Sequence, residues 1–264
     1  MSDRKATFHL GRISKKLQSA GCIYAEEEAF LLVSAAHSPA ELALMVAKRS
    51  AGEPLEHVIG WAEFCGLKIR VDRNVFVPRR RTEFLVHQAG SAVREGAIVV
   101  DLCCGSGAIG AALAASIGSI ELHATDIDSN AVHCACRNLA SIGAHIYEGD
   151  LYEPLPAALK GKIDLIVANV PYVPTEMLAR LPAEARLYEA REAHDGGKDG
   201  LAMHRKAAAG AVTWLAPSGC FMAEANIRQA PQIVEILSSH GLKTEVARSE
   251  ELDATVIIGK PSSA

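Results

Sequence analysis

A short glycine-rich stretch decides how this chain folds: Ile98-Val99-Val100-Asp101-Leu102-Cys103-Cys104-Gly105-Ser106-Gly107-Ala108-Ile109-Gly110. Its mostly apolar beginning predicts a buried strand, and the alanine-rich continuation predicts a helix. Between them, Gly105, Gly107 and Gly110 have the G-x-G-x-x-G spacing that lets a nucleotide-like ligand approach backbone N–H groups. A tight turn with close packing of helix on sheet needs the same glycines. The loop alone therefore leaves both interpretations open.

The sequence after this loop continues to alternate short apolar runs with helical patterns, which predicts a mostly parallel sheet covered by helices. The expected strands are 97–102, 120–125, 145–147, 163–168, 220–223, 244–247 and 255–258, and the expected helices are 108–117, 130–142, 201–215 and 229–240. Residues 1–72 show apolar residues at helical spacing interrupted by glycine and proline. We therefore expect a small helical N-terminal domain over 1–72 and an α/β domain over 73–264.

Composition limits the class of protein. The 264 residues are 49% hydrophobic and 22% charged, as in ordinary globular proteins. Neither a secretory signal nor a run of ~18 apolar residues is visible, so we expect a cytoplasmic protein without a membrane span. The formal charge of −4 gives no basic field for duplex nucleic acid. Seven cysteines without zinc or redox spacing predict reduced thiols and no metal site. We expect a monomer.

Acidic residues follow the next two predicted strands. Asp126 ends the second strand, where a carboxylate can accept hydrogen bonds from both hydroxyls of a ribose. It could instead cap the following helix, but Asp128 can fill that role equally well. Asp150 follows the third strand and could accept a bond from an adenine amino group, with Leu151 against the ring; a plain Gly-Asp turn explains it as well. An adenosine cofactor fits this pattern, in either a dinucleotide enzyme or a methyltransferase.

The fourth predicted strand ends in the deciding tetrad, Asn169-Val170-Pro171-Tyr172. An amide or aromatic amine is a poor nucleophile because its lone pair is delocalised. Two fixed acceptors, the Asn169 side-chain oxygen and the Val170 carbonyl, can bind both of its N–H groups and aim the nitrogen at a methyl donor. Pro171 stiffens the turn, and Tyr172 offers an aromatic face to a flat acceptor group. The tetrad thus predicts methylation of a planar nitrogen.

With these residues the sequence resembles the HemK/PrmC-type protein-(glutamine-N5) methyltransferases, whose best-known members modify peptide-chain release factors. The resemblance extends over nearly the whole chain, through 54–60, 63–64, 77–83, the glycine loop, the tetrad and 195–201. It implies a class I S-adenosylmethionine-dependent methyltransferase fold, Rossmann-like and seven-stranded, whose last strand is antiparallel. It also implies that the helical domain recognises a protein substrate that carries a glutamine.

The resemblance also implies site residues. Catalysis is expected from the tetrad, residues 169–172, and the expected contacts to S-adenosylmethionine are Asp101, Cys103, Cys104, Gly105, Ser106, Gly107, Asp126, Asp150, Leu151 and Asn169. The expected substrate contacts are Arg79, Arg80, Arg81, Asn169 and Tyr172. Two of these arginines replace a Pro and an Asp of the family pattern, and Val170 replaces a proline. These departures predict a divergent branch whose substrate can differ from a release factor, although a solvated turn also explains the arginines.

Other functions remain to be weighed. The tetrad would accept a small molecule or the amine of a nucleic-acid base by the same geometry, although the acidic charge argues against DNA. A short-chain dehydrogenase would need Tyr-x-x-x-Lys, which the sequence lacks. A binding module without activity is the third alternative. His194, beside Asp195 and a Gly-Gly pair, is expected to be solvated and without a role.

Overall fold

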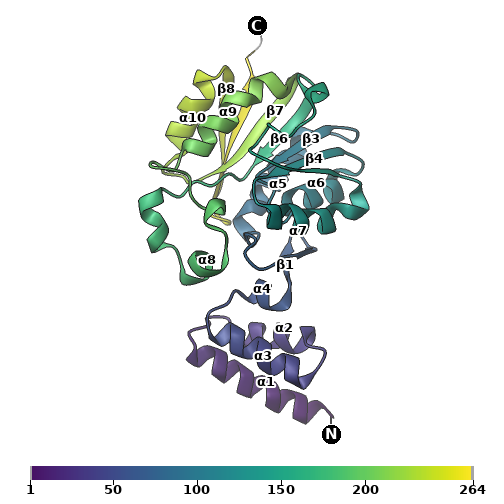
Figure 1. Ribbon diagram of the computed structural model, residues 1–264, viewed down its shortest axis with the longest axis vertical. Coiled ribbons are helices and arrows are strands. Elements are labelled where there is room, and N and C mark those ends of the chain that lie inside the picture. The colour runs from purple at the N-terminus through teal and green to yellow at the C-terminus, as the bar shows by residue number, and fades with distance from the viewer. Residues whose placement is uncertain (1, 263–264) are drawn as a thin grey trace.

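The computed structural model describes residues 2–262, and its N-terminal part is a small helical unit (Figure 1). The helices are α1 (Ser2–Ser19), α2 (Ala25–Ala35), α3 (Pro39–Ser50) and α4 (Leu55–Ile59). Ser38 caps α3 by accepting a hydrogen bond from the Glu41 backbone N–H at 3.1 Å. Leu17, Leu32 and Val46 are buried together between the helices, so this unit has a core of its own.

A β-hairpin follows, where the sequence predicted helix up to residue 72. Its strands are β1 (Trp61–Phe64) and β2 (Leu67–Arg70), which pair antiparallel. The turn residues Cys65 and Gly66 both have positive φ, 49° and 73°, as a two-residue hairpin turn requires. Alternate side chains of the hairpin are buried, and Phe64 and Ile69 join the core of the sheet. The expectation of helix over 61–70 is therefore wrong.

The main sheet has seven strands in the order β5-β4-β3-β6-β7-β9-β8. They are β3 (Ile98–Leu102), β4 (Glu121–Asp126), β5 (His145–Glu148), β6 (Ile163–Ala168), β7 (Leu215–Ala225), β8 (Leu242–Ser249) and β9 (Ala254–Pro261). Strands β3 to β7 pair parallel, and β9 runs antiparallel to both β7 and β8. The predicted α/β sheet with an antiparallel last strand is confirmed.

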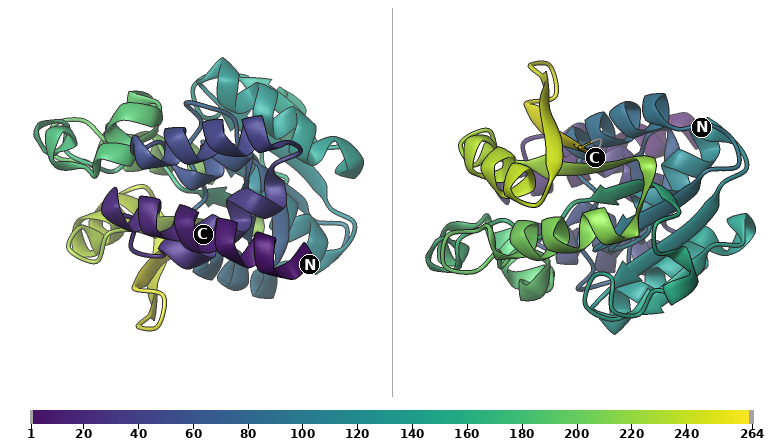
Figure 2. Two further views of the ribbon diagram at one scale, coloured as in Figure 1. Left: turned by 90° about the horizontal axis from the view of Figure 1, so that it is seen from below. Right: turned by 90° about the horizontal axis from the view of Figure 1, so that it is seen from above.

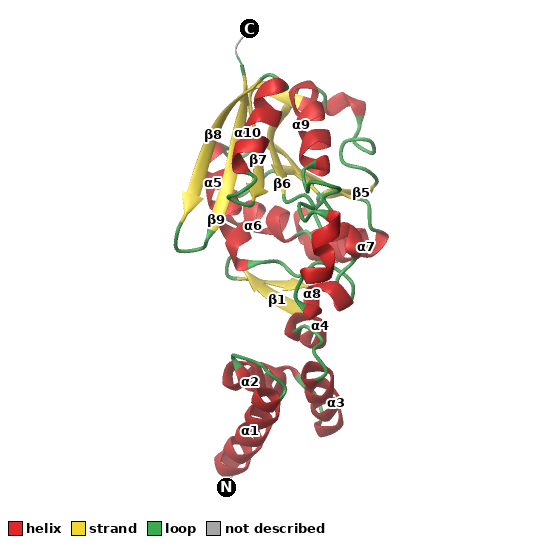
Figure 3. Ribbon diagram, turned by 90° about the vertical axis from the view of Figure 1, so that its left-hand side faces the viewer, coloured by secondary structure: helices red, strands yellow, loops and turns green. Residues whose placement is uncertain are grey.

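Helices cover both faces of this sheet, and Figure 3 distinguishes the two kinds of element by colour. One face packs against α9 (Ala202–Trp214) and α10 (Ala230–Ser239), and the other packs against α5 (Glu83–Ala92), α6 (Ala108–Ile117) and α7 (Ser129–Leu139). Successive side chains of a strand point to opposite faces of the sheet, so each strand contributes to the hydrophobic core on both faces. Val100 and Leu102 of β3 face α9 and α10, while Val99 faces the opposite side. Helix α5 was not predicted.

The remaining elements are short and lie mostly in the connections. They are η1 (Arg80–Thr82), η2 (Ala140–Ile142), η3 (Ala157–Leu159), η4 (Thr175–Arg180), α8 (Ala183–Tyr188) and η5 (Arg191–Ala193). The segment with η4, α8 and η5 projects from the sheet on the side of the N-terminal helices (Figure 1). In the view from below, those N-terminal helices lie across the end of the sheet (Figure 2). None of the described helices is long and apolar enough to cross a membrane.

Candidate active site

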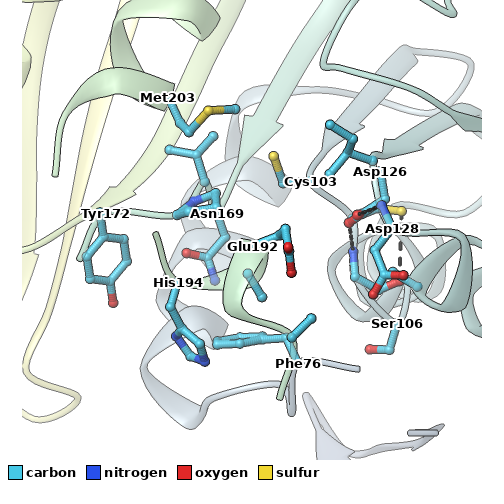
Figure 4. A pocket seen from close by; sticks show the side chains of 18 of the residues that line it. Phe76, Cys103, Ser106, Asp126, Asp128, Asn169, Tyr172, Glu192, His194 and Met203 are labelled. Carbon is cyan, nitrogen blue, oxygen red and sulfur yellow. Dashed lines mark hydrogen bonds between the residues drawn. The ribbon is translucent and has the colours of Figure 1, made fainter. Parts of the chain in front are cut away.

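A cavity of about 700 Å³ opens at the carboxyl ends of β3, β4 and β6 (Figure 4). Strand β3 lies between β4 and β6 in the sheet, so the chain order reverses direction here, which is where open α/β sheets bind ligands. The wall contains residues 103–106, 125–128, 149–151 and 169–173, together with parts of 74–82 and 181–195. The four predicted motifs therefore meet at one place.

The glycines of the loop lie in two different environments. Gly107 has φ +77°, and a Cβ there would lie 3.0 Å from a methyl group of Leu139, while a Cβ on Gly110 would lie 2.8 Å from Leu122. These glycines allow close packing of the helix. Gly105 also has positive φ but faces open space at the cavity wall, where Cys103, Cys104 and Ser106 also lie.

Asp101 lies beneath this loop, and neither it nor Gly107 belongs to the cavity wall. Its side chain is fully buried, and Oδ2 accepts a hydrogen bond from the Gly110 backbone N–H at 3.1 Å. Oδ1 has no partner among the described residues. Burial raises the pKa of Asp101 to about 7. In the structure this residue holds the start of α6 against β3, and its expected contact with the cofactor stays a prediction.

The Asp126 carboxylate links the glycine loop after β3 to the loop after β4 at the cavity wall. Oδ2 accepts a hydrogen bond from the Gly105 backbone N–H at 2.8 Å, and Oδ1 accepts one from the Asp128 backbone N–H at 2.9 Å. Burial raises its pKa, while these two N–H groups act in the opposite direction. Asp128 caps α7 by accepting from the Asn130 backbone N–H. Each oxygen of Asp126 keeps a second lone pair, since a carboxylate can accept about four bonds.

The third acidic position has a cationic neighbour that the sequence did not reveal. Asp150 forms an ion pair with Lys206 of α9 at 2.7 Å, and both residues line the cavity. Leu151 follows with φ 50° and is buried. Ile127 and Met203 also belong to the wall. Ile127 is 61% exposed, so an apolar side chain stands uncovered directly after Asp126.

The tetrad follows β6 and holds two unoccupied acceptors. The Asn169 side chain and the Val170 carbonyl have no hydrogen-bond partner among the described residues, although both residues lie on the cavity wall. Figure 4 shows Asn169 with Tyr172 on one side and Glu192 on the other. The Tyr172 hydroxyl is engaged by protein groups, and burial together with Glu224 raises its pKa to about 12.

The three consecutive arginines have different environments. Arg79 bonds both oxygens of buried Glu189, at 2.6 and 2.7 Å. Arg81 bonds Glu224 at 3.0 Å and the Tyr172 hydroxyl at 2.5 Å, and both Arg79 and Arg81 line the cavity. Arg80 is exposed and lies outside the cavity wall. The predicted run is thus not a uniformly solvated turn.

His194 is buried, in contrast to the solvated side chain expected from the sequence. Its Nε2 lies 2.8 Å from Glu189, and its ring meets Phe76 edge-on with centroids 5.6 Å apart. His194 and Phe76 line the cavity (Figure 4), whereas Glu189 does not. Phe76 was not singled out from the sequence, and His194 was named without a role, because their contact joins segments that are distant in sequence. No group of three or more His, Cys, Asp and Glu residues that could hold a metal occurs within 2–262.

Known proteins are similar to this chain in sequence and in fold. Residues 67–219 match the family described as methyltransferase small domain. A release factor glutamine methyltransferase from Geobacter sulfurreducens is 39% identical over 209 residues, which cover 77% of this chain and 72% of that protein. One from Streptomyces coelicolor is 37% identical over 193 residues, which cover 72% and 68%.

Among solved structures, a methyltransferase from Pyrococcus furiosus is similar with a TM-score of 0.55 at 17% identity, over 74% of this chain and 88% of that one. A ribosomal protein L11 methylase from Lactobacillus delbrueckii is similar with a TM-score of 0.51 at 18% identity, over 70% and 81%. At such identities these two structures establish the fold alone.

Proposed function

Because this chain belongs to the methyltransferase family that includes the release factor glutamine methyltransferases, we propose that it methylates the side-chain amide nitrogen of a protein glutamine. The observation that carries the proposal is the pair of unoccupied acceptors at the end of β6. The Asn169 side chain and the Val170 carbonyl stand on the cavity wall without donors among residues 2–262, and a primary amide brings two N–H groups.

The methyl donor is S-adenosylmethionine, and the residues at the other end of the cavity fit it. Asp126 has free lone pairs for a ribose diol, and the hydroxyl of Thr125 is buried at the wall with no partner in the described part of the chain. Ile127 offers an exposed apolar surface suited to a purine ring. When bound, the cofactor supplies an electrophilic methyl group on sulfur. The predicted contacts of 103–106 and 149–151 remain proposals of the same kind.

The work of the tetrad is to orient the amide. Two acceptors that bind both N–H groups leave the nitrogen with one open direction, and they bind more strongly as the nitrogen gains positive charge. Their positions are fixed before the substrate arrives because β6 and the buried Val170 and Pro171 hold the turn. One preorganised group of this type is worth about 10²–10³ in rate.

The substrate is a protein, and we propose that it is a release factor or a protein with a similarly exposed glutamine. The helical N-terminal unit, which the sequence places within 1–72, is the proposed recognition domain. It has a core of its own and lies at one end of the molecule (Figure 1), and Arg49 of α3 forms an ion pair with Glu184, which lines the cavity. Arg80 is exposed near the cavity and is the arginine of the run best placed to contact that partner. We still expect that the protein is a monomer, that it acts in the cytoplasm and that it does not bind duplex nucleic acid.

Transfer of label tests this substrate. The protein is incubated with S-adenosylmethionine labelled in its methyl group and with each purified release factor of the same organism. We expect label in one release factor and none after its methylated glutamine is replaced by alanine. Label that enters RNA or small molecules but never a protein would contradict the proposed substrate class.

A further inference from the structure

The hydroxyl of Tyr172 is held by a triangle of contacts that the proposed chemistry does not itself require. It accepts a hydrogen bond from Arg81 Nη2 at 2.5 Å and donates one to Glu224 Oε1 at 3.3 Å. Arg81 Nε closes the triangle by donating to the same Glu224 oxygen at 3.0 Å. The three residues come from η1, from the tetrad and from the end of β7, so distant parts of the chain meet at this hydroxyl.

Glu224 gives the triangle a rigid base. It is 2% exposed on β7, and its second oxygen accepts a hydrogen bond from Thr82 Oγ1 at 2.5 Å. A buried carboxylate is costly unless it is paired with a cation and hydrogen-bonded. Arg81 supplies that positive charge. The Arg81 guanidinium is therefore held by Glu224, although its side chain is 46% exposed at the cavity wall.

The backbone of Tyr172 is fixed independently of its side chain. Its carbonyl accepts a hydrogen bond from Gln229 Nε2 at 3.1 Å, and Gly200 packs so closely on that carbonyl that a Cβ would collide with it. Gly196 approaches the Tyr172 Cα, where a Cβ would lie at 2.8 Å. With the backbone fixed, the direction of the ring is the remaining freedom. The bonds to the hydroxyl determine that direction.

We propose that Arg81 is a positioning residue for methyl transfer, which acts by fixing the ring of Tyr172 beside Asn169 and not by touching the substrate. The inference rests on the proposed function, because it assumes that the flat acceptor amide packs against this ring. Figure 4 shows the ring and the Asn169 amide side by side at the cavity wall. Arg81 is exposed like Arg80, but in this account it acts through its bonds to Glu224 and Tyr172, whereas Arg80 contacts the substrate directly.

A double-mutant cycle tests the proposal. Arg81→Ala and Tyr172→Phe should each lower kcat/KM for a glutamine substrate by about 10- to 100-fold, since small misplacement of a reacting group costs up to about 10² in rate. The double variant should be no more than about threefold worse than the poorer single variant, because both changes remove the same contact. The dissociation constant of S-adenosylmethionine, measured by calorimetry, should stay within about twofold of wild type. Multiplying effects would show that Arg81 contacts the substrate directly and would overturn the proposal.

A second variant separates the loss of the bond to Tyr172 from the loss of the charge that Arg81 places beside Glu224. Without Arg81 the buried Glu224 carboxylate lacks its cation, which can unfold the protein, so Arg81→Met is combined with Glu224→Gln. This pair restores neutrality but not the bond to Tyr172, and we expect a folded protein whose kcat/KM remains at least tenfold low. Recovery of wild-type kcat/KM would show that Arg81 only neutralises Glu224, and the proposal would be wrong. Wild-type protein that methylates no glutamine would instead contradict the proposed function.

Discussion

Replacement of Asp126 by asparagine, usually a mild change, should be nearly as harmful as replacement by alanine. The carboxylate receives one backbone N–H on each oxygen, from Gly105 and from Asp128, at 2.8 and 2.9 Å. Asparagine has one acceptor and one donor at these positions, so its NH₂ group would face one of the two N–H donors. Both variants also lose the charged acceptor proposed for the ribose.

The size of the effect follows from these contacts. Hydrogen bonds to a charged group contribute about 1.5–3 kcal/mol, so the dissociation constant of S-adenosylmethionine should rise about 10- to 150-fold for either variant. Asp128→Asn is the matched control, because asparagine caps a helix as well as aspartate does and binding should change less than about twofold. Calorimetry gives the constants, and circular dichroism checks the fold. Unchanged binding by both Asp126 variants would refute the assignment and leave Asp126 as a link between two loops.

Three further predictions concern the tetrad, Asp101 and Arg80. Asn169→Ala should lower the single-turnover rate of methyl transfer about 10²–10³-fold with the fold intact. Val170→Pro keeps the backbone carbonyl, so its rate should stay within about tenfold of wild type. An active Asn169→Ala enzyme would mean that the tetrad is only a turn. Because the pKa of Asp101 is raised from 3.8 to about 7 in the folded state, the native protein keeps a proton that the unfolded chain loses. Its free energy of unfolding should therefore fall as pH rises from about 4 to 7, by at most ~1.4 kcal/mol per pH unit, and Asp101→Asn should flatten this slope in denaturant titrations. Arg80→Ala should raise KM for the protein substrate severalfold and leave KM for a short glutamine peptide unchanged; equal KM values for the protein substrate would place Arg80 outside the interface.

Periodicity and spacing predicted most of the sheet domain. Helix 108–117 was predicted at its observed bounds, and strand 163–168 likewise, because each combines a strong apolar pattern with clear boundary residues. The hairpin 61–70 was not predicted, because strands of four residues are too short for an alternation of apolar and polar residues to stand out beside the helical pattern of the preceding residues. Its Cys-Gly turn, where only the second residue is glycine, gives a weaker signal than Asn-Gly.

The site was predicted at the level of motifs but not of side-chain direction. The tetrad and the acidic strand ends share one cavity because the carboxyl ends of parallel strands meet at one edge. Asp101 was assigned to the cofactor, yet it shares the face of β3 with Val99, beneath the loop. The contact of Arg81 with Glu224 and that of His194 with Phe76 join residues far apart in the sequence, which no local pattern encodes. The antiparallel last strand came from the resemblance and not from local patterning.

Mass spectrometry of the methylated product tests the central claim most directly. The protein is incubated with S-adenosylmethionine that carries a deuterated methyl group and with its protein substrate, and the product is digested and fragmented. We predict one added methyl group on a glutamine, retained on the side-chain nitrogen and released as methylamine on acid hydrolysis. A methyl group on a carboxylate, a lysine or a backbone atom would contradict the account, because none of these presents two amide N–H groups to Asn169 and Val170.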